Sequence, residues 1–194
     1  LFLLFKMLLF HYVFLPLPKS NIFLLKTMSK FRLNKILKKT KRPNKAFVNW
    51  GSAISFLVLI EGKSIEEMNK RTHELRKIFA EKHVIVFGFL TTKDKKREST
   101  QAIFDKVLTK KDLTLFKNPP KITMEWIKNT PCDVLINLIQ PENTVANILV
   151  ATSNAKTKCG QQNSVPQLLD LMIQFDKTPT ENELLEQILF YLKS

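Results

Sequence analysis

Glycine is scarce in this sequence, which limits the kinds of ligand site that the chain can build. Only four of the 194 residues are glycine, at positions 51, 62, 88 and 160. Phosphate-binding loops of the GxGxxG and GxxxxGK types need closely spaced glycines, because backbone N–H groups must approach the phosphate oxygens. The four glycines fit neither pattern, so the sequence argues against a conventional nucleotide-binding loop.

Cysteine and histidine are few and widely spaced. Cys132 and Cys159 lie 27 positions apart, and His11, His73 and His83 form neither an HxxxH nor an HExxH pattern. Zinc sites that can be recognised in a sequence need closer ligand spacing than this. We therefore expect no metal site and no cofactor. We interpret the two cysteines as buried free thiols of a protein from a reducing compartment.

Acidic residues are absent from the first 60 positions, since Glu61 is the first in the chain. Those positions hold 11 of the 31 Lys and Arg residues, which leaves 20 basic against 17 acidic residues in the remainder. Of the formal net charge of +14, only +3 therefore belongs to the chain from residue 61 onward. A cationic front end on a nearly neutral body is typical of a segment that meets polyanions.

The most basic stretch is MSKFRLNKILKKTKRPNK, residues 28–45. On a helix, Leu33, Ile36 and Leu37 would share one face and most of the basic residues the other. Three roles fit this pattern: a solvated helix that docks on the body, an arm that binds RNA or another nucleic acid, or a helix on an anionic membrane. Its candidate anion-binding residues are Lys30, Arg32, Lys35, Lys38, Lys39, Lys41, Arg42 and Lys45.

Residues 1–27 are apolar but lack the marks of a membrane span or a signal peptide. Their longest uncharged run, Met7 to Pro18, has 12 residues, whereas a span needs about 20. Neither a strong basic segment nor a small-x-small cleavage site is evident. We interpret residues 1–27 as an extension upstream of a start at Met28. The predicted organisation is thus 1–27 extension, 28–50 basic arm or helix and 51–194 α/β domain.

From residue 51 onward, apolar runs alternate with amphipathic stretches. The predicted strands lie at 52–60, 84–90, 133–138, 155–160 and 168–175, although the last run also fits a helix. The predicted helices lie at 64–80, 99–109, 122–129, 141–152 and 180–193, with capping boxes at Ser64–Glu67 and Thr180–Glu183. Residues 113–120 are predicted to be extended, and Ile122, Trp126 and Ile127 to face inward. The pattern predicts one three-layer α/β domain with a mostly parallel sheet of about five strands, including a right-handed βαβ unit.

Ligands of open α/β sheets usually lie beyond the carboxyl ends of the strands. At those positions the sequence offers a candidate pocket made of Glu61, Thr92, Lys93 and Asn137. No local catalytic motif accompanies these residues, so we expect a protein that is not an enzyme. The enzyme alternative stays open, because a site that is assembled in space leaves no local motif.

Segments of the later body carry a resemblance to a known family. The matching residues are Asp133, Leu135 and Ile136, then Ser153, Ala155, Lys156, Lys158 and Gly160, and finally Tyr191 and Leu192. Over roughly residues 30–194 the chain resembles a family of small uncharacterised Bacteroidota proteins, a domain of unknown function. The resemblance implies a basic N-terminal helix before the first strand, and it assigns no biochemical activity to the family.

Lys156 and Lys158 would share one face of a strand, because side chains alternate along it. They either present a small cationic patch to an anion or protect an edge strand against pairing.

These observations predict a cytoplasmic α/β protein that is not an enzyme and whose polybasic arm binds RNA or a ribonucleoprotein. One alternative is a peripheral membrane protein that is anchored by its basic amphipathic N-terminus, and membrane-associated if residues 1–27 are expressed. The other is an enzyme with a site at the strand carboxyl ends.

Overall fold

Six strands form one sheet in the computed structural model, which describes residues 31–38, 47–92, 102–163, 165 and 167–194. Each neighbouring pair is parallel, in the order β3-β2-β1-β4-β5-β6. The strands are β1 (Ser55–Gly62), β2 (His83–Leu90), β3 (Lys106–Thr109), β4 (Val134–Asn137), β5 (Thr157–Gln161) and β6 (Leu171–Ile173). The helices are α3 (Ile65–Ile78), α4 (Lys121–Asn129), α5 (Thr144–Thr152) and α6 (Glu181–Lys193), and residues 31–38 are also helical.

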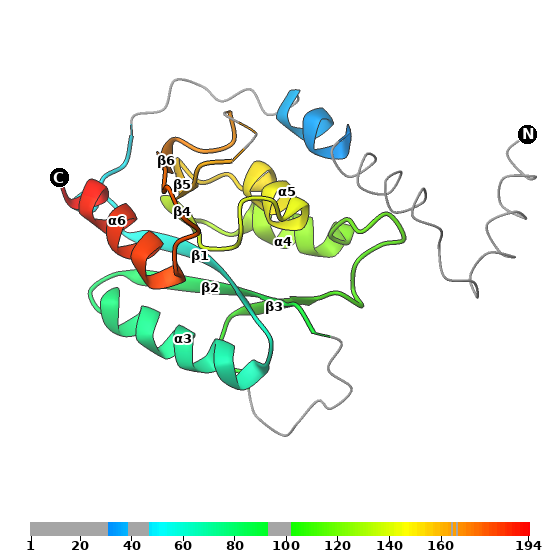
Figure 1. Ribbon diagram of the computed structural model, residues 1–194, viewed down its shortest axis with the longest axis horizontal. Helices are drawn as coiled ribbons and strands as arrows, with labels where there is room; N and C mark the ends of the chain where they lie inside the picture. Colours follow the sequence, from blue (N-terminus) through cyan, green and yellow to red (C-terminus); the bar gives the residue numbers. More distant parts are fainter. Residues whose placement is uncertain (1–30, 39–46, 93–101, 164, 166) are drawn as a thin grey trace, which may run out of the picture.

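Helices cover both faces of the sheet, which confirms the predicted three-layer α/β class (Figure 1). One hydrophobic core contains Met68 of α3 and Ile188 of α6. The second core, on the opposite face, contains Ile127 of α4 and Leu149 of α5. The helix after β1 and the helix after β4 thus lie on opposite faces, so the chain reverses its winding direction between these two strands.

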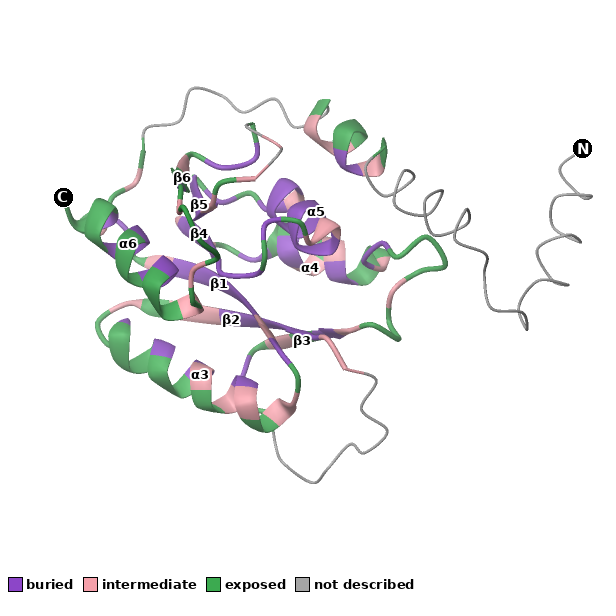
Figure 2. Cartoon of the chain, viewed as in Figure 1, coloured by how far each residue is buried: buried purple, intermediate pink, exposed green. Residues whose placement is uncertain are grey.

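The central strands are apolar over most of their length because both of their faces are covered. Residues 56–60 of β1 are buried, and so are all four residues of β4 (Figure 2). A strand that is buried on both faces is a continuous apolar run and not an alternating one. This is why the sequence predicted β1, β2 and β4 correctly. The parallel pairing of β1 with β2 around α3 confirms the predicted βαβ unit.

Side-chain caps fix where the helices begin. Ser64 accepts a hydrogen bond from the Glu67 N–H at the start of α3. Thr180 and Glu183 form the predicted capping box at the start of α6. The predicted inward stripe of α6 is buried: Leu184, Leu185, Ile188, Leu189 and Leu192.

The prediction for residues 99–109 was wrong, because residues 106–109 form β3 and not a helix. Leu108 is buried, whereas Val107 is 36% exposed, so the side chains alternate as they do on an edge strand. Four residues are too few for this alternation to outweigh a helical pattern of apolar residues in the sequence. The sheet consequently has six strands instead of about five. Residues 99–101 lie outside the described part.

The region between β3 and α4 also departs from the prediction. Residues 113–120 are not extended: the Lys117 N–H donates to the Thr114 carbonyl, which closes a tight turn. Ile122 faces outward and is 69% exposed. Ile127 is buried as predicted and Trp126 is half-buried against the second core. Thr123, one turn from Ile127 on the same face, packs inward in place of Ile122.

The helix at residues 31–38 lies against the body on the side of α4 and α5 (Figure 1). Leu33 is buried in the second core, and Ile36 and Leu37 pack against it. The guanidinium of Arg32 contacts the sulfur of Met124 on α4 at 3.5 Å. Of the three roles considered for the basic stretch, docking on the body therefore applies to residues 31–38. No helix in the described part of the chain is long and apolar enough to cross a membrane.

Candidate functional site at the carboxyl edge of the sheet

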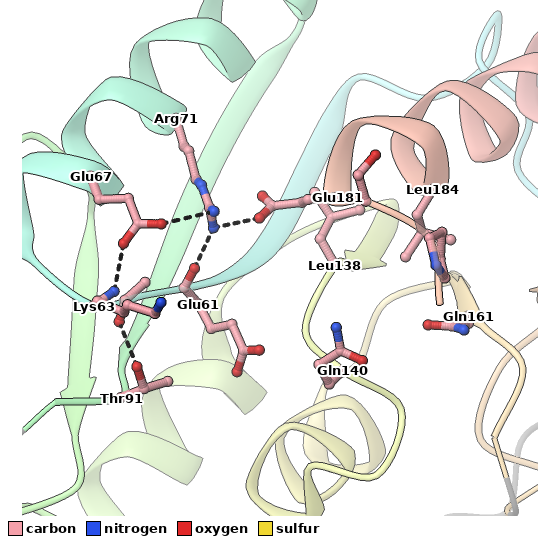
Figure 3. Close-up of a pocket in the computed structure, with 13 residues that line it drawn as sticks. Glu61, Lys63, Glu67, Arg71, Thr91, Leu138, Gln140, Gln161, Glu181 and Leu184 are labelled. Carbon is pink, nitrogen blue, oxygen red and sulfur yellow. Dashed lines mark hydrogen bonds and ion pairs between the residues drawn. The ribbon is translucent and has the colours of Figure 1, made fainter. Parts of the chain in front are cut away.

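A pocket of about 380 Å³ lies at the edge where the parallel strands end. Its walls come from the residues that end β1 and β5, from the loops after β2 and β4, and from the start of α6 (Figure 3). The pocket lies beside the point between β1 and β4 where the winding direction reverses. In open α/β sheets such a point leaves a crevice between diverging loops, and ligands commonly bind there.

Arg71 of α3 organises one wall of the pocket. Its guanidinium donates to the Glu61 carbonyl oxygen, to the Glu181 carboxylate at 2.6 Å and to the Glu67 carboxylate at 3.0 Å. Helix α3 brings Glu67 and Arg71 together because they lie one turn apart. Glu181 is 110 positions from Arg71 in the sequence, and only the fold brings it there.

The environment of Glu181 favours its neutral form. The side chain is only 19% exposed. Burial raises the pKa of Glu181 to about 7, although the nearby Arg71 lowers this pKa and the carboxylates of Glu61, Glu67 and Glu74 raise it further. An acid whose pKa lies near 7 exchanges its proton at neutral pH, which is unusual for glutamate.

Glu61, at the end of β1, contributes both its backbone carbonyl and its side chain to the site. Its carbonyl oxygen faces Arg71, whereas its side chain extends away from Arg71 on the side of Gln140 (Figure 3). Burial raises the pKa of Glu61, while the Asn143 side chain, whose amide nitrogen lies 3.5 Å from the carboxylate, and the Gln140 N–H both lower it. The side-chain amides of Gln140 and Gln161 add hydrogen-bond donors and acceptors on the opposite side.

Three helix N-termini at this edge, those of α3, α5 and α6, carry side-chain caps, whereas α4 begins after Pro120 without one. The Ser64 hydroxyl caps α3, the Asn143 side chain caps α5, and the Thr180 hydroxyl caps α6. In addition, the Glu67 carboxylate accepts the Lys63 N–H at 2.7 Å. These caps therefore already bond some of the backbone N–H groups that could otherwise hold a phosphate.

The described members of the predicted pocket do not line one common cavity in the structure. Glu61 lines the pocket. The Thr92 hydroxyl donates to the Lys63 carbonyl, and its neighbour Thr91 lines the pocket instead. Asn137 is only 2% exposed, and its side-chain oxygen accepts the Ile139 N–H. Lys93 lies outside the described residues.

The candidate anion-binding residues also lie apart from one another. Lys35 and Lys38 are exposed on the helix at residues 31–38. Lys156 pairs with Asp133 at 2.7 Å, whereas Lys158 is 2% exposed and its ammonium donates to the Val150 carbonyl. The edge-strand interpretation was wrong, because β5 pairs with a strand on each side. The remaining candidates fall outside the described residues: Lys30, Lys39, Lys41, Arg42 and Lys45.

Neither cysteine offers a reactive thiol. Cys159 is buried and Cys132 is half-buried, and both are free. Burial raises the pKa of Cys132 to about 11 and that of Cys159 further still, so both thiols stay protonated at neutral pH. His73 and His83 are exposed on the surface. Within the described ranges, no group of three His, Cys, Asp or Glu side chains could hold a metal ion.

The strand order and the pocket at the reversal point define a doubly wound α/β protein. Residues 26–194 match the model of a family of unknown function, DUF6913, and the chain belongs to that family. The resemblance to a domain of unknown function is thereby confirmed.

Comparison with curated proteins finds no match. Among solved structures, the chain is similar to a glycosyl transferase family 9 protein from Veillonella parvula DSM 2008, with a TM-score of 0.43 and 14% sequence identity. That similarity covers 77% of this chain and 43% of the other, so the chain spans less than half of the length of the glycosyl transferase.

Proposed function

We propose that the chain binds a small polar molecule, uncharged or cationic, in the pocket at the carboxyl edge of the sheet. The observation that carries this proposal is the engagement of Arg71 by three acceptors from the protein itself. These three acceptors use three of the five N–H donors of Arg71 and two of them are carboxylates, so its positive charge is already paired within the protein.

The charge of the pocket supports the same class of ligand. Among the described residues that line it, the carboxylates of Glu61 and Glu67 balance the two cations, Arg71 and Lys63, and Glu181 is partly protonated at pH 7, so the lining has no excess of positive charge for an anion. Carboxylate oxygens accept hydrogen bonds from hydroxyl and ammonium groups, and side-chain amides both donate and accept. A molecule that carries several hydroxyl or amino groups therefore complements this lining. A phosphate does not, because the neighbouring helix N-termini are capped.

A second property of the pocket favours the enzyme alternative at the same place. Glu181 has a pKa of about 7 and lines the pocket. A general acid or base works best when its pKa lies near the working pH. In this alternative, Glu181 transfers a proton to or from the bound molecule, and Arg71 positions its carboxylate.

Ligand titrations followed by ¹H–¹⁵N nuclear magnetic resonance test the binding proposal. The probes are monosaccharides, amino sugars, nucleosides and polyamines, with inorganic phosphate and nucleotides as the opposing set. We expect saturable shifts of the Gly62, Gln140 and Gln161 amide signals with a member of the first set, and binding at least ~10-fold weaker for Glu61→Gln, because a charge-assisted hydrogen bond contributes about 1.5–3 kcal/mol.

The matched control is Glu81→Gln, which removes an exposed carboxylate at the end of the sheet away from the pocket. It should leave the affinity unchanged. Binding of phosphates and nucleotides alone, or shifts that map away from the pocket, would overturn the proposal.

The predicted RNA or ribonucleoprotein partner of the basic arm is a second and separate proposal. Leu33 anchors the helix at residues 31–38 and leaves Lys35 and Lys38 exposed on its outer side, which supports it. We expect salt-dependent binding to RNA whose salt slope falls for Lys35→Ser/Lys38→Ser but not for Lys70→Ser/Lys77→Ser on α3. Retention on anionic vesicles without RNA binding would favour the membrane alternative instead.

A further inference from the structure

The corner that joins β3 to α4, residues 110–122, presents large apolar side chains at a turn. The Lys117 N–H donates to the Thr114 carbonyl at 2.8 Å, so Leu115 and Phe116 occupy the two central positions of a β-turn. Leu115 is 63% exposed and Phe116 is 38% exposed. Central turn positions normally hold polar residues, glycine or proline. Two adjacent hydrophobic residues at such a place need an explanation.

The protein itself holds this turn in a defined shape. The Thr114 N–H donates to the Asn118 carbonyl at 3.0 Å, and the Asn118 N–H donates to the Thr114 hydroxyl at 3.2 Å. Asn118 is buried, and Lys117 has a φ of 53°, a left-handed conformation that is uncommon outside glycine. These hydrogen bonds therefore hold Leu115 and Phe116 at the apex of a defined turn.

Lysines flank this apex along the chain. The corner contains four exposed lysines, Lys110, Lys111, Lys117 and Lys121, of which Lys121 also pairs with Glu125 of α4 at 3.4 Å. Its single acidic residue, Asp112, accepts the Thr109 N–H and hydroxyl, both at 2.8 Å. Ile122, the second residue of α4, adds a third large apolar side chain that is 69% exposed.

We propose that the β3–α4 corner docks on an anionic lipid bilayer, with Leu115 and Phe116 in the acyl boundary and the lysines at the headgroups. Exposed aliphatic and aromatic side chains accompanied by lysines are the combination that binds the interface of an anionic membrane. A second copy of the chain fits poorly, because in a symmetric contact its own lysines would face these lysines. RNA fits less well, since Phe116 could stack on a base but the more exposed Leu115 and Ile122 could not.

This surface differs from the predicted N-terminal anchor and from the pocket, although it shares an edge with the pocket. Parallel strands end at the same edge of a sheet, so the loop after β3 leaves on the side where β1 ends (Figure 1). A chain that is docked through the corner would keep the pocket on its membrane-proximal edge. The corner can dock whether or not the pocket binds a ligand.

Co-sedimentation of the full chain with vesicles tests the proposal. The vesicles contain phosphatidylcholine with phosphatidylserine, or phosphatidylcholine alone. We expect binding to the anionic vesicles, at least ~10-fold weaker for Leu115→Ser/Phe116→Ser, because the variant loses the apolar area that would be buried. The control Ile54→Ser/Phe190→Ser changes two side chains that are 74% and 65% exposed and lie outside the corner. It should bind as the unchanged chain does.

A fluorescent label separates docking by the corner from docking by the basic arm. An environment-sensitive dye on Leu115→Cys should brighten on anionic vesicles, whereas the same dye on Ile54→Cys should not. Equal vesicle binding by the unchanged chain and by Leu115→Ser/Phe116→Ser would overturn the proposal. So would a silent Leu115→Cys label, or binding to RNA without binding to vesicles.

Discussion

Replacing Glu181 by glutamine should make the protein more stable at pH 8, although the change removes an ion pair with Arg71. The carboxylate lies 2.6 Å from the guanidinium but is only 19% exposed. Its raised pKa means that burial destabilises the charged carboxylate by more than the interaction with Arg71 stabilises it. A neutral glutamine of similar shape avoids this cost.

The sign and size of the effect follow from the pKa. The folded state binds the Glu181 proton more tightly than the unfolded state, because the pKa rises from 4.5 to about 7. Stability from this group is therefore fully present below pH 4.5 and is lost as the pH rises through 7. At about 1.36 kcal/mol per pKa unit, the loss is about 3 kcal/mol. Glu181→Gln should gain about 2–3 kcal/mol over the unchanged chain at pH 8 and almost nothing at pH 4.

Urea unfolding at pH 4, 6 and 8 measures this difference through the extrapolated free energy of unfolding. Glu186→Gln, on the exposed side of the same helix, controls for loss of a negative charge in α6. It should show no gain that appears between pH 4 and pH 8. Destabilisation of Glu181→Gln at pH 8 would refute the reasoning, because the ion pair would then outweigh the cost of burial.

Other predictions concern the first strand and its surroundings. Gly62→Ala would place a Cβ atom 2.6 Å from the Met68 Cγ atom, and the free energy of unfolding measured in urea should fall by about 1–3 kcal/mol. Asp133→Asn removes a charged partner of Lys156 and of the β1 backbone. This change should lower the free energy of unfolding by about 1.5–3 kcal/mol at pH 7. The Lys156 hydrogen bond first, and then those from β1, lower the pKa of Asp133 to about 2, so the cost should shrink as the pH falls from 3.8 toward 2. Leu33→Ala should speed amide hydrogen exchange in residues 31–38 while leaving β1 protected, because the buried leucine holds this helix on the second core.

The sheet could be predicted where burial alone determines the pattern. Both faces of β1 and β4 are covered, so their residues form apolar runs that stand out in the sequence. Strand β3 was missed because it is short and lies at the edge, with Val107 exposed. Ile122 was misplaced because its apolar character suggests burial, whereas the structure uses Thr123 to pack α4 inward.

The candidate site could be predicted only in part. Glu61 follows from the rule that ligands bind beyond strand ends, and the structure places it in the pocket. Arg71 and Glu181 carry no local signal, since 110 positions separate them and each belongs to an ordinary amphipathic helix. The turn at Leu115 was also hidden, because an apolar pair shortly before two prolines looks like a strand end and not like a turn apex.

Analysis of what the protein carries from its own cells tests the proposed pocket most directly. The chain and its Glu61→Gln variant would be purified gently, and each would be examined by native mass spectrometry before and after denaturation. We predict a bound small molecule, uncharged or cationic and rich in hydroxyl or amino groups, that the variant does not retain. A phosphorylated ligand, or the same ligand held equally well by Glu61→Gln, would contradict the proposed site.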